Sequence, residues 1–323
     1  MKVLVTGGAG YIGSVVASQL IEEGHETVVL DDLSKGHREA VPEGTRLLRG
    51  NLMDAGFTSE TLSEGFDGVL HFAALSLVGE SVEMPESYYR NNVCGTLNLL
   101  EAMREAGTER LVFSSTAAVY GEPEEVPIQE TAPALPTNPY GSSKLAVDRL
   151  IGAVCGARGL AATSLRYFNV AGASDRFGED HHPETHLIPL VLRAAGEGSS
   201  VKIFGTDYPT RDGTAVRDYI HVEDLGRAHL LALEAAEPGE HRVYNLGNGA
   251  GFSVREVVEA ARRVTGKSID AVEAPRRAGD PPTLVASSEK IQADLGWKPE
   301  KPDLETMISD AWNWMQDHPN GYG

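Results

Sequence analysis

The stretch "NPYGSSKLAVDRL", residues 138–150, contains a tyrosine and a lysine four residues apart. Tyr140 and Lys144 fall at positions i and i+4 of a predicted amphipathic helix, so their side chains share one face. At about 5 Å and an effective dielectric near 20, the ammonium favours the phenolate by about 3 kcal/mol, which lowers the tyrosine pKa by roughly two units. The pair is therefore predicted to act as a base near neutral pH.

A hydroxyl suited to the same chemistry follows a predicted strand. The segment "LVFSSTAAVYG" places Ser115 and Thr116 at the carboxyl end of that strand. Ligands of open α/β sheets bind beyond the carboxyl ends of the strands. A hydroxyl at this position can hydrogen-bond a substrate oxygen as its proton leaves.

Glycines near the N-terminus predict a dinucleotide site. The segment "VLVTGGAGYIGSVVASQL" places Gly7, Gly10 and Gly13 at a turn from a strand to a helix. A tight turn, a close approach of the backbone and a helix N-terminus together suit a pyrophosphate.

Two acidic residues end the second predicted strand and support the same site. Asp31 and Asp32 follow the glycines at about the spacing in the sequence at which an acidic residue binds the adenosine ribose. A carboxylate there repels a 2′-phosphate, so NAD is favoured over NADP. The nearby cations Lys35 and Arg38 leave NADP open as an alternative.

Short β-branched runs alternate with helical stretches through the first half of the chain. The runs are "KVLVTG", "ETVVLDD", "DGVLHFAA", "ERLVFSS" and "LAATSLRYFN". Apolar strands separated by helices predict βαβ units and a parallel sheet covered on both faces. The expected fold class is α/β, with a Rossmann-like doubly wound parallel sheet.

The pattern changes after about residue 170 to loops rich in Gly, Pro, Asp and Arg, with separate helices such as "SVREVVEAARRVTG". We expect an NAD-binding domain over residues 1–170, onto which part of about 216–246 packs back. A smaller C-terminal α/β lobe over residues 171–323 is expected to bind the substrate. The last residues, "HPNGYG", are expected to form a loose tail.

The charge and cysteine content limit the partners and the compartment. A net charge of −19 disfavours nucleic acid and anionic membrane surfaces as partners, so an anionic ligand needs local cations or backbone amides. Cys94 and Cys155 form no CxxC pair, which argues against a disulfide framework and a cysteine zinc site. No run of about 18 apolar residues occurs. A cytoplasmic protein without a membrane span is expected.

The motifs "TGGAGYIG", "HFAA", "NNVCGT", "SSTAAVYG", "PYGSSK" and "RYFNVAGA", in this order, resemble the extended short-chain dehydrogenase/reductase family. The later segments "HLIPLVL", "VRDYIHVEDL", "YNLGNGAGFSV" and "APRRAGDP" are similar to members that epimerise UDP-hexoses. The resemblance covers about residues 1–315. It implies a homodimer that uses NAD to interconvert UDP-glucose and UDP-galactose through a 4-keto sugar.

The resemblance also implies roles for individual residues. Tyr140 would be the base, Lys144 would hold the nicotinamide ribose, and Thr116 would aid proton transfer. The residues implied at the cofactor are Gly7, Gly10, Tyr11, Ile12, Gly13, Asp31, Asp32, Asn51, Leu52, Phe72, Ala73, Ala74, Asn92, Ser114, Tyr140, Lys144 and Tyr167. The residues implied at the UDP-sugar are Thr116, Asn169, His186, Leu187, Phe204, Arg217, Arg277, Asp280 and Leu284.

Three positions of the implied substrate site differ from those of other family members, and Thr116, which replaces a serine common in the family, keeps the hydroxyl and adds a methyl group. His186 stands where asparagine is common, and together with His181 and His182 it is interpreted as part of a polar loop, so no metal site is predicted. Leu284 is smaller than the tyrosine of some members. This difference suggests that UDP-N-acetylhexosamines also fit.

Alternative functions remain for this pattern. Nucleotide-sugar 4,6-dehydratases share the fold and the Tyr-Lys pair, but they commonly have Asp-Glu after the active-site hydroxyl, where this chain has Ala117 and Ala118. A different epimerase of the same family is also possible. A non-enzymatic NAD-sensing regulator would need neither the Tyr-Lys pair nor arginines in the late loops.

Overall fold

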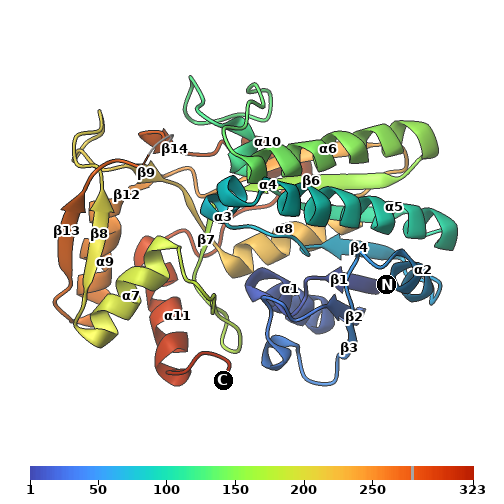
Figure 1. The fold of residues 1–323 in the computed structure, drawn as a ribbon, viewed down its shortest axis with the longest axis horizontal. Helices are drawn as coiled ribbons and strands as arrows, with labels where there is room; N and C mark the ends of the chain where they lie inside the picture. The colour runs from blue at the N-terminus through green and yellow to red at the C-terminus, as the bar shows by residue number, and fades with distance from the viewer. Residues whose placement is uncertain (278–279) are drawn as a thin grey trace. The chain divides into compact units, whose positions relative to one another are not determined.

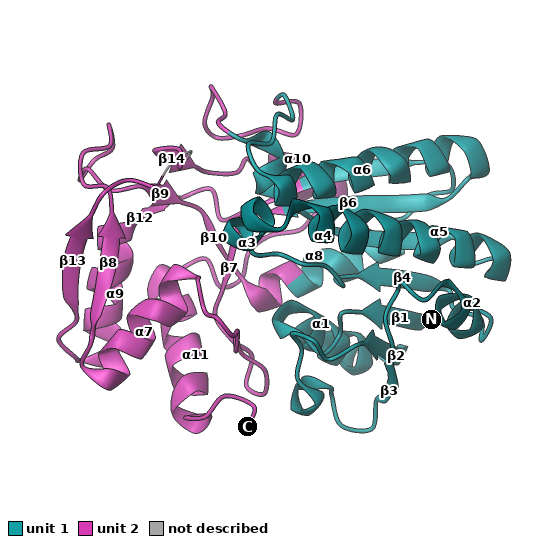
Figure 2. Ribbon diagram, in the orientation of Figure 1, with its two compact units in different colours: residues 1–121, 133–166, 226–244 teal, residues 122–132, 167–225, 245–323 magenta. Residues whose placement is uncertain are grey.

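The structure, a computed structural model, describes residues 1–277 and 280–323 (Figure 1). The chain divides into two compact units, each with its own core (Figure 2). Unit 1 comprises residues 1–121, 133–166 and 226–244, and unit 2 comprises residues 122–132, 167–225 and 245–323. The ligand roles expected for the two parts of the chain stay predictions.

A seven-stranded sheet with the order β11-β6-β5-β4-β1-β2-β3 organises unit 1. Its strands are β1 (Lys2–Thr6), β2 (Glu26–Asp31), β3 (Arg46–Arg49), β4 (Gly68–His71), β5 (Arg110–Thr116), β6 (Ala161–Tyr167) and β11 (His241–Leu246). β1 pairs in parallel with both β2 and β4. The carboxyl ends of these three central strands therefore meet at one edge, next to the glycine-rich turn.

All five strands predicted from apolar runs are present, but two further strands were not predicted. β3 has the sequence "RLLR", whose terminal arginines hide its short apolar pair. β11 has the sequence "HRVYNL" and lies far along the chain from its neighbour β6. Neither strand has the continuous apolar run from which the other strands were predicted.

Helices cover both faces of this sheet (Figure 1). On one face α2 (Ala55–Leu62), α5 (Gly95–Ala106) and α6 (Pro139–Arg158) contribute Leu62, Leu99 and Ile151 to a core with Leu4 and Phe113. On the other face lie α1 (Tyr11–Glu22) and α8 (Val222–Glu234). The predicted doubly wound α/β fold is confirmed.

Short helical segments connect β4 to α5 and β5 to α6. α3 (Val78–Glu83), α4 (Pro85–Tyr88) and a π-helix (Tyr89–Cys94) precede α5, and a 3₁₀ turn (Ala117–Tyr120) follows β5. Within residues 1–277 and 280–323, no helix combines the length and apolar content needed to cross a bilayer.

The described residues of unit 2 form small sheets and four helices. Its strands are β7 (Asn169–Ala171), β8 (Ser200–Phe204), β9 (Val216–Arg217), β10 (Tyr219–His221), β12 (Phe252–Ser253), β13 (Asp270–Ala274) and β14 (Thr283–Leu284). Its helices are α7 (Leu187–Glu197), α9 (Val254–Thr265), α10 (Glu289–Leu295) and α11 (Leu304–Asp317). The prediction of α9 is confirmed, and a capping box between Ser253 and Glu256 begins it.

The expectation of a loose C-terminal tail is wrong. The imidazole of His318 stacks on Trp314 at a centroid distance of 4.6 Å. The backbone N–H of Tyr322 donates to Asp180 Oδ2 at 3.0 Å, and the Tyr322 hydroxyl accepts from Gly178 N at 3.0 Å. Aromatic side chains and an acceptor on the preceding loop therefore order the end of the chain.

Candidate active site

The start of α6 sets the spacing of the predicted catalytic pair. The side chain of Asn138 accepts from Gly141 N at 2.9 Å, and Pro139 occupies the first helical position. An N-cap asparagine followed by proline is a strong signal for a helix start, because the proline φ suits that position. Tyr140 and Lys144 are consequently one helical turn apart, as predicted.

Lys144 is directed at the carboxyl end of β5. The residue is only 2% exposed, and Nζ donates to the backbone carbonyl of Ser114 at 2.8 Å. The ammonium also lies 4.8 Å from the centroid of the Phe113 ring. Burial lowers the pKa of Lys144 to about 7, while the charge of Asp148 opposes this shift.

Tyr140 is hydrogen-bonded to Thr116. Burial raises the pKa of the Tyr140 phenol above its usual value, and the hydrogen bond with the Thr116 side chain acts in the opposite direction. The Tyr140 ring meets Tyr88 edge to face at a centroid distance of 6.4 Å. The Thr116 hydroxyl also accepts from Ala118 N at 3.1 Å.

The predicted effect of Lys144 on Tyr140 is not seen in this structure. The pKa of Tyr140 is raised rather than lowered, because loss of hydration dominates. The Lys144 ammonium is hydrogen-bonded to the Ser114 carbonyl. The group that lowers the pKa of the phenol is Thr116.

The glycine-rich turn between β1 and α1 is a close backbone contact. Gly7 has φ +72°, and a Cβ there would lie 2.5 Å from Ala73 N. A Cβ on Gly13 would lie 2.2 Å from Gly7 O. Gly10 is the N-cap residue of α1 and provides no side-chain cap, and the N-terminus of a helix favours an anion.

The two acids at the end of β2 lie beside this turn. Asp31 accepts from Ala9 N at 3.0 Å and from Leu33 N at 2.8 Å, and burial raises its pKa. Asp32 accepts from Asn51 Nδ2 at 2.6 Å. Each Asp31 oxygen accepts one backbone bond, so each keeps a lone pair that can accept from a ribose hydroxyl.

Other residues predicted at the cofactor surround the ends of the same strands. Phe72 N and Ala73 N both donate to Thr6 O, which ties β4 to β1. Asn92 is buried, and its Nδ2 donates to Leu75 O and to Ser143 Oγ, both at 3.0 Å. Tyr11 and Ile12 open α1, Leu52 follows β3, Ala74 follows β4, Ser114 lies in β5 and Tyr167 ends β6. Tyr167 belongs to unit 2.

A buried ion pair that the sequence did not suggest supports α6. Arg166 on β6 donates from Nε and Nη2 to Asp148 Oδ2 at 3.0 and 2.9 Å, and from Nη1 to the Tyr120 hydroxyl at 3.1 Å. Ser115 Oγ donates to the same carboxylate oxygen at 3.2 Å. Asp148 follows Lys144 by one helical turn, so it shares the face of α6 that carries Tyr140 and Lys144. This position was the signal in the sequence from which a role for Asp148 could have been predicted.

Unit 2 brings together several residues predicted at the UDP-sugar. The Arg217 guanidinium pairs with the carboxylate of Asp280 and donates to Val216 O at 2.7 Å. Leu284 of β14 stands opposite Arg217 of β9 in the sheet register. Asn169 of β7 donates from Nδ2 to Asp218 O at 2.9 Å, next to Arg217 in the chain.

Arg277 and Phe204 form a second contact among these residues. The Arg277 guanidinium carbon lies 4.1 Å from the centroid of the Phe204 ring, a cation–π distance. Phe204 ends β8. Stacking limits the rotamers of the guanidinium and leaves its edge N–H groups for a phosphate oxygen.

Asp218 is a positioning residue that the sequence analysis did not select. Its buried carboxylate accepts from the backbone N–H groups of Asn248, Gly249 and Ala286 at 2.7 to 3.2 Å. These bonds join three segments that are distant in the sequence. Arg217 is therefore held on a rigid part of unit 2.

His186 and Leu187 lie at the start of α7. His186 is the N-cap residue, and Leu187 is the first residue of the helix. The His186 imidazole faces Glu179, whose charge raises the pKa of His186 to about 9.

Known proteins resemble this chain over its full length. A family model described as the NAD dependent epimerase/dehydratase family matches residues 3–247. The UDP-glucose 4-epimerase of Corynebacterium glutamicum is 59% identical over 97% of this chain and 95% of that protein. A crystal structure of a UDP-glucose 4-epimerase has a TM-score of 0.96 at 49% identity, with full coverage of both chains.

A further solved structure was determined with ligands. The UDP-glucose 4-epimerase of Bifidobacterium longum, in complex with NAD+ and UDP, has a TM-score of 0.94 at 37% identity. The match covers 99% of this chain and 100% of that chain. Given the match of the family model and the high identity of full-length relatives, the chain belongs to the NAD-dependent epimerase/dehydratase family.

Proposed function

We propose that the protein interconverts UDP-glucose and UDP-galactose by inverting C4 of the hexose. The observation that carries this proposal is the placement of Tyr140, which is hydrogen-bonded to Thr116 and lies one turn from buried Lys144. The UDP-glucose 4-epimerases named above match this chain over nearly its full length, and this similarity supports the proposal.

The glycine-rich turn fits an NAD cofactor. Gly7 and Gly13 have no room for a Cβ, and the N-terminus of α1 favours a pyrophosphate. Asp31 offers carboxylate oxygens to the ribose hydroxyls and disfavours a 2′-phosphate. When bound, NAD supplies reversible oxidation at C4 of the sugar.

The side chains of unit 1 manage the proton of the 4-hydroxyl. Tyr140 takes this proton as C4 is oxidised to the ketone, and returns it after the 4-keto sugar has rotated to present its opposite face. Thr116 stabilises the phenolate by its hydrogen bond. Lys144, held by the Ser114 carbonyl, presents further N–H groups from which the nicotinamide ribose hydroxyls can accept hydrogen bonds.

The side chains of unit 2 hold the nucleotide part of the substrate. Arg217 and Arg277 supply the local positive charge that a diphosphate needs on a protein with a net charge of −19. Phe204, Asn169, Asp280 and Leu187 complete the proposed uridine diphosphate site. Binding energy at this remote part of the substrate allows the hexose to turn without release.

Leu284 leads us to propose that UDP-N-acetylhexosamines are also substrates. Its place in β14 opposite Arg217 puts a medium-sized apolar side chain beside the proposed diphosphate site. We expect Leu284→Tyr to lose turnover of UDP-N-acetylglucosamine while retaining turnover of UDP-glucose. Equal losses for the two sugars, or no wild-type activity on the acetylated sugar, would reject this role.

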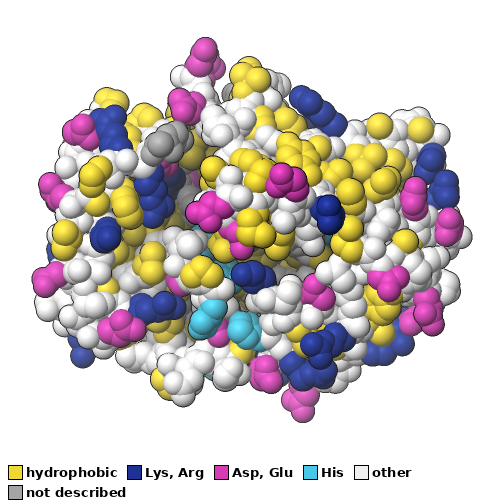
Figure 3. All heavy atoms as spheres, viewed as in Figure 1, with side chains coloured by type: hydrophobic (Ala, Val, Ile, Leu, Met, Phe, Trp, Pro, Cys, Tyr) yellow, Lys and Arg dark blue, Asp and Glu magenta, His cyan; other side chains and the backbone are white. Residues whose placement is uncertain are grey.

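We further propose that the protein is a homodimer. The exposed apolar side chains of unit 1 include Val82, Met84, Tyr89 and Leu97, on and between α3 and α5. Figure 3 shows hydrophobic atoms gathered over this part of unit 1. We expect wild-type protein to be dimeric by light scattering and Leu97→Glu to be monomeric, and a monomeric wild type would contradict the proposal.

A direct assay separates this function from its alternatives. Purified protein is mixed with UDP-galactose without added NAD, and the products are identified. UDP-glucose is the expected product, because the cofactor is regenerated in each cycle. A 4-keto-6-deoxy sugar would indicate a dehydratase, and absence of any product, also with added NAD, would favour a regulator. The cytoplasmic location stays a prediction. Cys94 and Cys155 are both free, which is the state expected in a reducing compartment.

A further inference from the structure

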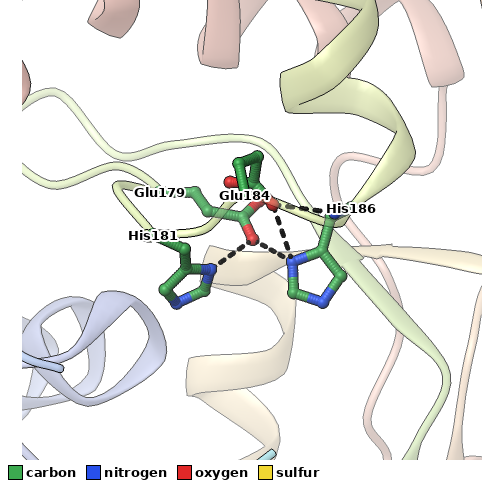
Figure 4. Close-up of side chains that lie close together, drawn as sticks. All are labelled: Glu179, His181, Glu184 and His186. Atoms are coloured by element: carbon green, nitrogen blue, oxygen red, sulfur yellow. Dashed lines mark hydrogen bonds and ion pairs between the residues drawn. The ribbon is translucent and has the colours of Figure 1, made fainter. Parts of the chain in front are cut away.

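The segment between β7 and α7 gathers two carboxylates and two imidazoles at one point (Figure 4). The four residues are Glu179, His181, Glu184 and His186, and one ligand atom from each lies within 4.8 Å of all the others. The sequence alone suggests only a polar loop for these histidines. Their convergence depends on how the segment folds back, which the spacing along the chain does not show.

Two separations between atoms of the ligand side chains are close to those around a tetrahedral metal ion. Glu179 Oε1 lies 3.0 Å from His181 Nδ1 and in shorter contact with His186 Nδ1. His186 Nδ1 lies 3.5 Å from Glu184 Oε1. Ligands at about 2.0–2.1 Å from a tetrahedral zinc ion are about 3.3 Å from one another.

The carboxylates are buried, and one imidazole atom lacks a hydrogen bond. The side chains of Glu179 and Glu184 are 7% and 1% exposed. His181 Nδ1 is inaccessible to solvent, and its contact with Glu179 does not have hydrogen-bond geometry. Two ligand atoms of one metal ion lie close together without a hydrogen bond between them, because each directs a lone pair at the ion.

The backbone already holds the ligands in place. The N–H groups of Thr185 and His186 donate to Glu184 Oε1 at 2.6 and 2.7 Å, so the other oxygen of this carboxylate is the one that binds the ion. Such supporting bonds fix metal ligands in known sites. The contacts of Tyr322 with Gly178 and Asp180 hold the start of the segment. The backbone around the four side chains is therefore fixed before an ion binds.

We propose that Glu179, His181, Glu184 and His186 bind one divalent transition-metal ion of the zinc type. Imidazole nitrogens favour zinc over magnesium or calcium, and two carboxylates neutralise a doubly charged cation. Four protein ligands leave no open position, so the ion has a structural role. It fixes the start of α7, where His186 and Leu187 lie, and this role is additional to the proposed epimerase function.

An ion pair without metal is the competing explanation. A protonated His186 accounts for its contacts with Glu179 and Glu184, but it leaves the buried His181 Nδ1 without a hydrogen bond. The two explanations differ in whether His181 matters for binding of a metal. His182 provides a matched control, because it is the adjacent histidine, its side chain is 79% exposed and it lies outside the four.

The test uses the full chain without an affinity tag, stripped with a chelator and titrated with zinc chloride by calorimetry. We expect one zinc ion per chain and a rise in the unfolding temperature on binding. His181→Gln should weaken binding by at least about tenfold, as expected when a ligand is lost, whereas His182→Gln should bind as the wild type does. Circular dichroism and NAD binding check that each variant is folded.

A second variant keeps the test decisive if His181→Gln is misfolded. Glu184→Gln retains a side-chain oxygen for the two backbone N–H groups but loses the charged ligand, so it should also weaken zinc binding. The proposal is overturned if the wild type binds no zinc at micromolar concentrations, or if His182→Gln weakens binding as much as His181→Gln. Because no substrate is present, the result does not depend on the epimerase proposal.

Discussion

The side chain of Thr116 hydrogen-bonds the phenol of Tyr140, and this bond opposes the burial that raises the pKa of the phenol. Thr116 ends β5 and Tyr140 lies in the first turn of α6, so two separate elements form the bond. The availability of the proposed base thus depends on a hydroxyl outside its own helix.

Replacing Thr116 should shift the pH dependence of turnover. Thr116→Val removes the hydroxyl at nearly constant shape, so the pKa of Tyr140 should rise. Because the base must lose its proton, the acid limb of the kcat profile should move to higher pH, and kcat at neutral pH should fall by up to about 100-fold. Thr116→Ser should restore most of the activity. Superimposable profiles for wild type and Thr116→Val would contradict this role.

Breaking the buried ion pair below α6 should destabilise the fold. Asp148→Ala leaves the guanidinium of Arg166 buried without its partner, which should cost about 3–5 kcal/mol of unfolding free energy. The double variant Asp148→Leu with Arg166→Met removes both charges and should recover much of the loss. Urea unfolding measures both values. A loss below about 1 kcal/mol for Asp148→Ala would show that the pair is unimportant.

His71 should make the stability of unit 1 sensitive to acid. The imidazole is buried, with Nδ1 at 2.7 Å from Thr6 Oγ1 and Nε2 at 2.9 Å from Thr96 Oγ1, and burial lowers its pKa to about 3. An unfolded histidine has a pKa near 6.5. The unfolded state therefore binds more protons between these values, and the contribution of His71 to stability is complete above pH 6.5 and is lost as pH falls through the window.

Denaturation at several pH values tests this linkage. Between pH 6 and 4 the wild type should lose up to about 1.4 kcal/mol per pH unit more than His71→Gln. Parallel losses in the two proteins would exclude a role for His71 in acid sensitivity.

Arg277 and Arg276 provide a matched pair for the nucleotide site. Arg277 stacks on Phe204, whereas Arg276 pairs with Asp207 and stacks on Tyr208. We expect Arg277→Ala to weaken UDP binding by about 1.5–3 kcal/mol, the value of a charge-assisted hydrogen bond, and Arg276→Ala to have little effect. Calorimetry with UDP decides between them. If the two variants weaken binding equally, Arg277 has no special place at the diphosphate.

Local signals predicted a large part of the fold and of unit 1's candidate site. The start of α6 followed from Asn138 and Pro139, which fixed the Tyr140–Lys144 spacing. The glycine-rich turn followed from the spacing of Gly7, Gly10 and Gly13. In the structure, Gly7 and Gly13 have no room for a Cβ. Five strands followed from apolar runs, because strands buried on both faces have continuous apolar sequence.

Contacts between distant segments were not predictable from local patterns. Lys144 bonds the Ser114 carbonyl and not the phenol, and Asp218 joins three segments through backbone amides. The convergence of Glu179 with His186 and the ordering of Tyr322 likewise depend on loops that have no periodicity. Burial, which raises the pKa of Tyr140, is also a property of the folded chain alone.

The most direct test of the central claim is turnover of UDP-galactose by Tyr140→Phe. This variant keeps the ring and its packing against Tyr88 but loses the hydroxyl that Thr116 contacts. We predict that kcat falls by at least about 100-fold while the affinities for UDP and NAD remain those of the wild type. A Tyr140→Phe enzyme with wild-type kcat would contradict the assignment of Tyr140 as the base.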